Sequence, residues 1–138
     1  MGGELADGRW HTRAPGRRIV YLSDNPAQCL LEMLVHLDRE QYFPSTFQLL
    51  SVEIPDHHVI TVGTISGLIQ DWPQHSEHTQ GIGNQWLDSA KSMAMLVPSV
   101  VMPVGWNCLL NPRVPGAAAL QVSNLGRFPL DKRLSSLI

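Results

Sequence analysis

Apolar and polar positions near the start of the chain predict a strand followed by a helix. Residues 19–23 (Ile-Val-Tyr-Leu-Ser) combine β-branched and aromatic side chains, which is typical of a strand. Asn25 and Pro26 follow, and a capping side chain before a proline predicts the start of a helix. The positions that then recur at helical spacing and form one apolar stripe are Ala27, Leu30, Leu31 and Leu34. We expect this helix to end near Leu37.

Shorter periodic segments fill the rest of the chain. Residues 47–54 alternate as a strand does, and residues 79–90 carry apolar side chains at helical spacing. The residues on one face of this strand are Leu50, Val52 and Ile54, and those four apart along this helix are Ile82, Trp86 and Ala90. The other expected strands are residues 59–62, 93–97, 106–110 and 119–123. Because strands outnumber helices and do not alternate regularly with them, we predict an α+β fold.

The longest apolar stretch, residues 93–110, has the length of a membrane span. The residues that interrupt it are Pro98, Ser99, Pro103, Gly105 and Asn107. Prolines and glycine would break a helix here, and the polar groups would lie unpaired in lipid. We therefore predict two strands joined by a turn, and no membrane segment.

Size and charge narrow the class of protein. The 138 residues, 43% of them hydrophobic, fit a single domain over residues 1–138 that folds without a disulfide or a structural metal. The net charge of −2 offers no basic surface for nucleic acid, so we expect no direct nucleic-acid binding. Residues 1–7 contain no apolar signal core, and we expect a cytoplasmic protein.

The cysteines and histidines do not indicate a metal or disulfide framework. Cys29 and Cys108 lie among apolar neighbours, so we predict small buried side chains rather than a disulfide. The histidine pairs are His57 with His58 and His75 with His78. Because these pairs lie in expected loops without a matching set of ligands, we predict no metal site.

Several segments, in a fixed order, resemble one known family. They are Gly8-Arg9-Trp10-His11, residues 19–23, residues 30–37 (Leu-Leu-Glu-Met-Leu-Val-His-Leu), residues 82–87 (Ile-Gly-Asn-Gln-Trp-Leu), residues 97–103 (Val-Pro-Ser-Val-Val-Met-Pro) and residues 107–113 (Asn-Cys-Leu-Leu-Asn-Pro-Arg). Each segment alone is a weak signal, whereas their shared order is specific. From about Gly8 to Leu134, the chain resembles the RES domain, which is named for an arginine, a glutamate and a serine.

The resemblance implies a fold similar to that of ADP-ribosyltransferase toxins, with small mixed sheets and a few helices. It also implies a toxin that degrades NAD as its substrate, requires no cofactor, and pairs with an Xre-type helix-turn-helix antitoxin. We expect the toxin to be oligomeric in that complex. Carried over by motif, the catalytic residues are Arg9, Tyr21, Glu32 and Ser99, and the NAD-binding residues are Arg9, Tyr21, Ser99 and Asn111.

These residue types suit cleavage of the bond between nicotinamide and ribose. Positive charge builds on the ribose as this bond breaks, and nicotinamide leaves without needing a proton. The useful group is therefore a fixed negative charge such as Glu32. A guanidinium such as Arg9 suits the pyrophosphate, and the ring of Tyr21 suits the cationic nicotinamide. Ser99 is expected to hydrogen-bond a ribose hydroxyl or Glu32, without acting as a nucleophile.

The sequence leaves the acceptor and the activity of this chain open. Water, inorganic phosphate or a protein side chain can each accept the ADP-ribosyl group, which makes the enzyme an NAD glycohydrolase, an NAD phosphorylase or a protein ADP-ribosyltransferase. The family usually opens with a further strand that carries its own arginine, whereas only eight residues precede Arg9 and they predict no strand. The alternative is therefore an incomplete RES module that binds its antitoxin without NAD turnover.

Overall fold

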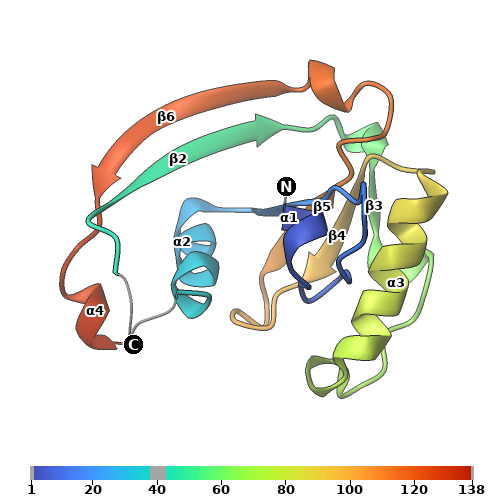
Figure 1. Ribbon diagram of the computed structural model, residues 1–138, viewed down its shortest axis with the longest axis horizontal. Helices are drawn as coiled ribbons and strands as arrows, with labels where there is room; N and C mark the ends of the chain where they lie inside the picture. Colours follow the sequence, from blue (N-terminus) through green and yellow to red (C-terminus); the bar gives the residue numbers. More distant parts are fainter. Residues whose placement is uncertain (1, 38–42, 138) are drawn as a thin grey trace.

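The computed structural model describes residues 2–37 and 43–137 (Figure 1). Its helices are α1 (Gly2–Leu5), α2 (Pro26–Val35), α3 (Ser76–Ser89) and α4 (Leu134–Leu137). Its strands are β1 (Val20–Ser23), β2 (Thr46–Glu53), β3 (Val59–Thr61), β4 (Ala94–Pro98), β5 (Trp106–Leu110) and β6 (Gln121–Pro129). The strands and helices expected from the sequence are confirmed to within three residues, except that β6 extends further than expected.

Two sheets organise these elements. The larger has the strand order β1-β5-β4-β3, in which β5 runs antiparallel to β1 and β4 while β3 runs parallel to β4. The smaller sheet pairs β2 with β6 in antiparallel fashion. In Figure 1 the larger sheet lies between α2 and α3, and the smaller one arches above α2. The prediction of an α+β fold with small mixed sheets and a few helices is confirmed.

The smaller sheet is a long, curved, two-stranded ribbon. Leu49 pairs with Gly126 and Leu50 with Asn124, which leaves Leu125 as the extra residue of a β-bulge. Gly126 has φ of +116°, a conformation that glycine adopts readily. The expected strand ended at Ser123, whereas β6 continues through this bulge to Pro129.

The apolar face expected along residues 47–54 is not part of the core. The side chain of Leu50 is 54% exposed, while Val52 and Ile54 are half-buried. β2 and β6 contact each other far more than they contact any other element. The alternation of apolar and polar residues predicts a strand, but it does not predict that another layer of the protein covers the apolar face of that strand.

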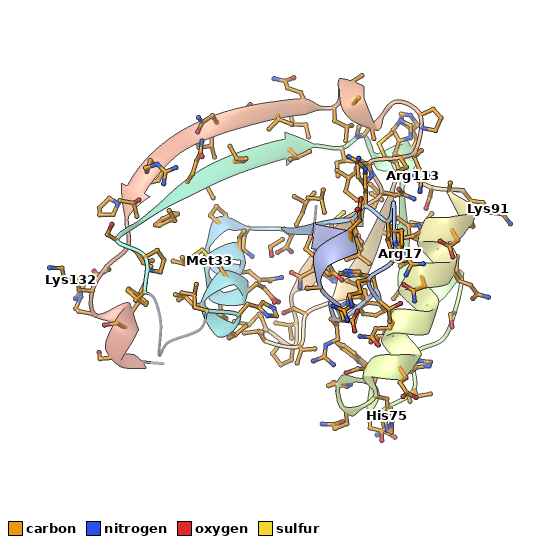
Figure 2. All side chains as sticks on the ribbon, viewed as in Figure 1. Arg17, Met33, His75, Lys91, Arg113 and Lys132 are labelled. Carbon is orange, nitrogen blue, oxygen red and sulfur yellow. The ribbon has the colours of Figure 1, made fainter. Side chains whose placement is uncertain are left out.

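The main hydrophobic core lies between α3 and the larger sheet. Its buried members are Trp10, Ile19, Val62, Ile82, Trp86, Leu87, Met95, Val97 and Leu109. Of the three residues expected four apart along this helix, Ile82 and Trp86 are buried in the core, whereas Ala90 is exposed and ends the helix in a left-handed conformation with φ of 50°. His75 and Lys91 mark the two ends of α3 in Figure 2.

The helix α2 begins as expected but buries a different set of residues. The Asn25 side chain accepts a 2.8 Å hydrogen bond from the Gln28 backbone N–H, and Pro26 occupies the first helical position. Of the apolar stripe, Leu34 is buried and Ala27 is exposed. Gln28 is buried instead, because β5 lies against that face of the helix and supplies polar partners.

The apolar segment 93–110 folds as β4, a turn and β5, in agreement with the sequence. The turn closes through hydrogen bonds from the Ser99 N–H to the Gly105 carbonyl (3.0 Å) and from the Gly105 N–H to the Met102 carbonyl (2.8 Å). Within the described residues, no helix has both the length and the apolar character needed to cross a membrane.

Candidate active site

A pocket of about 580 Å³ opens between β1, α2 and the turn that follows β4. Its lining comprises Arg9, Trp10, Tyr21, Leu22, Ser23, Cys29, Glu32, Met33, Val35, His36, Pro98, Val100, Val101 and Asn107. Most of these side chains are apolar, and Arg9 and Glu32 supply one cation and one carboxylate. The structure therefore brings three of the predicted residues, Arg9, Tyr21 and Glu32, to one concave site.

Glu32 projects from α2, and two donors from the larger sheet hold its Oε1 atom. The Ser99 hydroxyl donates to Oε1 at 2.6 Å, and the Asn107 amide Nδ2 donates to the same oxygen at 2.8 Å. Both partners are neutral, so no cation neutralises the carboxylate through these contacts. Within the described residues, the Oε2 atom receives no hydrogen bond from the protein. The carboxylate is thus anchored by one oxygen and can offer the other to a ligand.

Ser99 lies at the end of β4 and is almost fully buried, with 2% of its surface exposed. Its hydroxyl donates to Glu32 and accepts a 3.0 Å hydrogen bond from the Met102 backbone N–H. Of the two partners expected for Ser99, a ribose hydroxyl or Glu32, the structure shows Glu32. Because its proton is directed at a carboxylate acceptor and its oxygen also closes a turn, Ser99 supports the site as a fixed donor.

Tyr21 lies on β1 and is 41% exposed, and its hydroxyl group has two hydrogen-bond partners. The hydroxyl lies 2.7 Å from Nδ1 of His11 and accepts a 3.2 Å hydrogen bond from the Trp10 backbone N–H. His11 Nε2 lies 2.9 Å from the Ala6 carbonyl oxygen, so Nε2 carries the proton and Nδ1 accepts from Tyr21. Burial lowers the pKa of His11 and raises the pKa of Tyr21 to about 12, so both groups are neutral near pH 7.

Arg9 reaches the pocket from the segment that precedes β1. This segment is held in place by α3 and by the loop that precedes α3. The Arg9 Nη1 atom donates to the Pro73 carbonyl oxygen at 2.8 Å. From α3, the Thr79 hydroxyl donates to the Arg9 carbonyl at 2.6 Å, and the Gln80 amide donates to the Gly8 carbonyl at 2.9 Å. The guanidinium is half-buried, and its position depends on the packing of α3.

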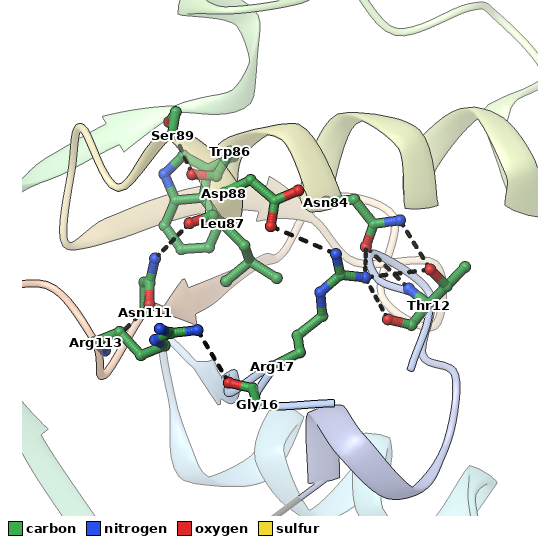
Figure 3. Close-up of polar contacts among 10 residues, drawn as sticks. All are labelled: Thr12, Gly16, Arg17, Asn84, Trp86, Leu87, Asp88, Ser89, Asn111 and Arg113. Carbon is green, nitrogen blue, oxygen red and sulfur yellow. Dashed lines mark hydrogen bonds and ion pairs between the residues drawn. The ribbon is translucent and has the colours of Figure 1, made fainter. Parts of the chain in front are cut away.

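Asn111, the fifth predicted residue, does not line this pocket. Its Nδ2 atom donates to the Leu87 carbonyl at 3.0 Å, and its Oδ1 atom accepts from the Arg113 N–H at 3.2 Å (Figure 3). Together with Arg17 and Arg113 it lines a separate depression of about 90 Å³ beside α3. The physical reason is its place just past β5, since four residues of strand separate it from Asn107 by roughly 13 Å. In this structure Asn111 ties β5 to α3.

Two polar residues of the site, Asn107 and Gln28, were not among those predicted. Asn107 lines the pocket from β5, and the buried Gln28 donates through Nε2 to the Asn107 Oδ1 at 2.8 Å. A signal for each was present in the sequence. Asn107 is the one polar residue within an apolar strand, and Gln28 precedes Glu32 by one helical turn, so their side chains share a helix face.

The two cysteines are free and differ in their surroundings. Cys29 is exposed and lines the pocket, so the prediction of a small buried side chain was wrong for this residue. The reason is that Cys29 lies on the face of α2 that the larger sheet leaves open. Cys108 is half-buried on β5, and burial raises the pKa of its thiol to about 11.

The histidines do not assemble a cation site in the part of the chain that the structure describes. No group of three or more His, Cys, Asp or Glu side chains lies together there in a way that could hold a metal ion. His75 forms an exposed pair with Asp71 (2.8 Å), and the rings of His57 and His58 lie against each other.

The segment before Gly8 contains the short helix α1 rather than a strand. Its Ala6 carbonyl accepts from His11, and Arg13 N–H donates to the Asp7 carboxylate at 2.7 Å. This segment therefore supports the residues around Tyr21 and brings no arginine of its own to the pocket.

The chain is similar in sequence to a known family and to several known proteins. Residues 1–131 match the RES domain family. Toxin Res of Pseudomonas putida is 38% identical over 136 residues, which cover 96% of this chain and 89% of that protein. Toxin Res of Photorhabdus laumondii is 36% identical over 113 residues (80% and 70%), and the Prs ADP-ribosylating toxin of a Sphingobium species is 31% identical over 137 residues (96% and 83%). Because the family match extends over nearly the whole chain, this protein belongs to the RES domain family.

Proposed function

We propose that this chain is a toxin that breaks the bond between nicotinamide and ribose in NAD. The observation that carries the proposal is the Glu32 carboxylate, held by Ser99 and Asn107 at the wall of a pocket that also contains Arg9 and Tyr21. The proposal is also supported by the names of the similar proteins, which are toxins, one of them ADP-ribosylating.

The role of Glu32 follows from the charge that develops during cleavage. As the bond to nicotinamide breaks, the ribose approaches an oxocarbenium ion, and a nearby carboxylate stabilises that positive charge. Two hydrogen bonds fix Oε1, so the carboxylate needs little reorganisation when the charge appears on the ribose. The largely apolar pocket lowers the local dielectric and strengthens the interaction.

Arg9 and Tyr21 are proposed to bind the two ends of the reacting half of NAD. A guanidinium matches two oxygens of the pyrophosphate, and among the described residues Arg9 commits only its Nη1 atom, to the Pro73 carbonyl. The hydroxyl of Tyr21 is occupied by His11 and Trp10, so the group that Tyr21 offers to the pocket is its ring. An aromatic face suits the cationic nicotinamide ring.

The acceptor of the ADP-ribosyl group is water or inorganic phosphate in this proposal. A second candidate is a protein side chain, which the name of the Sphingobium relative favours. The three reactions release the same nicotinamide and differ in the second product. Free ADP-ribose indicates water, a phosphorylated ADP-ribose indicates phosphate, and labelled protein indicates protein transfer.

We further propose that the toxin acts in the cytoplasm and is blocked by an Xre-type antitoxin that covers the pocket. The toxin names of the relatives support a protein partner of this kind. Co-expression with a candidate antitoxin should yield a complex without NAD turnover. Wild-type turnover by a verified complex would exclude the covering mechanism.

The decisive experiment measures nicotinamide release by the purified chain, free of antitoxin, with and without phosphate. Glu32→Gln keeps the shape of the side chain and removes its charge, and we expect it to lower turnover roughly a hundredfold or more. The matched control is Glu53→Gln, the same change at an exposed residue of β2, which should leave turnover unchanged.

Two outcomes would contradict the proposal. Wild-type turnover by folded Glu32→Gln would remove the carboxylate from the mechanism. No release by the folded wild-type chain would favour the alternative, a RES module that binds an antitoxin without NAD turnover.

A further inference from the structure

We infer that Asn107 is a positioning residue that aims the Glu32 carboxylate, and that Ser23 and Gln28 fix the orientation of Asn107. The inference rests on the proposed function, because Glu32 is the catalytic carboxylate only if the chain cleaves NAD. It concerns a polar network that links β1, α2 and β5, and of which Ser23 and Asn107 also line the pocket.

The contacts of Asn107 allow only one orientation of its amide. Its Oδ1 atom accepts from the Ser23 hydroxyl at 2.9 Å and from the Gln28 Nε2 at 2.8 Å. Its Nδ2 atom is then the group that faces Glu32 Oε1 at 2.8 Å. A reversed amide would set an N–H group against the Gln28 N–H group and an oxygen against the carboxylate, two repulsive contacts in place of two favourable ones.

Gln28 is itself held in one orientation. Its Nε2 atom donates to the Trp106 carbonyl at 2.8 Å as well as to Asn107, so both amide protons are used. The residue is only 4% exposed, and its Oε1 atom is buried without a hydrogen-bond partner within the described residues. A buried carbonyl without a partner is unfavourable. The orientation of the Gln28 amide is therefore best explained by the two N–H groups of Nε2, which both donate to β5.

Space around Gln28 leads to the same conclusion. A Cβ atom built on Gly105 would overlap the Gln28 side-chain oxygen, so the turn between β4 and β5 packs directly on this amide. The same turn carries Ser99, the other donor to Glu32. Both donors to the carboxylate are thus set by packing behind the pocket, and neither depends on bound substrate for its position.

The test compares Asn107→Asp with the wild type in nicotinamide release across a range of pH. This variant keeps the shape of the side chain but places a second carboxylate against Glu32, and like charges at this distance raise the pKa values of the pair. We expect kcat to fall roughly tenfold to a hundredfold, KM for NAD to stay within about threefold, and the acidic limb of the profile to move to higher pH. The other titratable groups that line the pocket, Arg9, Tyr21, Cys29 and His36, are unchanged in the variant.

Two further variants keep the test decisive. Gln28→Leu removes both donors and should lower kcat in the same direction, by about three- to tenfold, without moving the pH profile. Asn124→Asp is the matched control, because Asn124 is exposed on β6 and its side-chain oxygen accepts from the Gly126 N–H, which an aspartate oxygen can do as well. It should match the wild type in both kcat and pH profile.

The inference is overturned if folded Asn107→Asp or Gln28→Leu retains wild-type kcat, or if Asn107→Asp loses kcat with an unshifted pH profile. Failure of the proposed function has a different signature, since the wild type itself would then release no nicotinamide. In that case the NMR signals of the Asn107 side-chain NH₂ group test whether the hydrogen bonds from Asn107 to Glu32 and from Gln28 to Asn107 exist. They should shift in both Glu32→Gln and Gln28→Leu if the network is present, and unchanged signals would overturn it.

Discussion

Replacing Gly83 with alanine tests how α3 holds the segment that carries Arg9. Gly83 lies in the middle of α3, and a Cβ atom built on it would overlap the Trp10 carbonyl oxygen. Trp10 is buried in the core and cannot move away without disturbing its neighbours. The added methyl group therefore has to separate α3 from the Gly8–Trp10 segment.

Three contributions determine how much Gly83→Ala changes the free energy of unfolding. In the interior of a helix, replacing glycine with alanine favours folding by about 1 kcal/mol. Overpacking a close contact in a core opposes it by about 1–3 kcal/mol. Separation of the segments also weakens the hydrogen bonds from Thr79 to Arg9 and from Gln80 to Gly8, at roughly 1 kcal/mol each. We expect Gly83→Ala to lower the free energy of unfolding by about 3 kcal/mol.

Gly81→Ala is the matched control, because Gly81 lies in the same helix and a Cβ atom built there meets no atom within 4 Å. It should stabilise the protein by about 0.5–1 kcal/mol. Urea denaturation of the wild type and both variants measures the two free energies. Gly83→Ala as stable as Gly81→Ala would refute the close approach of α3 to Trp10. If NAD is the substrate, Gly83→Ala should also raise KM, because Arg9 moves with the displaced segment.

Two further predictions concern stability. Burial lowers the pKa of His11 from 6.5, so around and below pH 6.5 the unfolded chain binds more protons than the folded chain. The contribution of His11 to the free energy of unfolding is therefore fully present above pH 6.5. It is lost as the pH falls towards the pKa of the folded state. Thermal unfolding from pH 7.5 to 5 should show this loss, and His11→Gln should reduce it, whereas an identical pH dependence in the variant would contradict the assignment. Asn111→Ala should lower the free energy of unfolding by about 2–4 kcal/mol, because the Leu87 carbonyl and Arg113 N–H lose their partner. KM for NAD should be unchanged in the folded variant, and a large rise in KM with normal stability would return Asn111 to the substrate site.

The local sequence determined the elements of this fold. The capping residue Asn25 before Pro26 predicted the start of α2, and alternating or continuous apolar runs predicted the strands, because both signals act between near neighbours in the chain. The family resemblance, based on ordered motifs, predicted Arg9, Tyr21 and Glu32, which the structure brings to one pocket. Ser99 lies in an apolar run, and the need of its hydroxyl for a partner pointed to a ribose hydroxyl or Glu32; the structure pairs it with Glu32, 67 positions away in the chain.

Tertiary structure decided what local pattern does not encode. The exposure of Leu50 and of Cys29 depends on whether another layer covers a given face, and no periodicity reports that. The separation of Asn111 from the pocket depends on which end of β5 faces α2. The hydrogen bonds that Asn107 accepts from Ser23 and Gln28 depend on the antiparallel pairing of β5 with β1. Each of these properties is set by contacts between segments distant in the chain, and such contacts exist only once the sheet has formed.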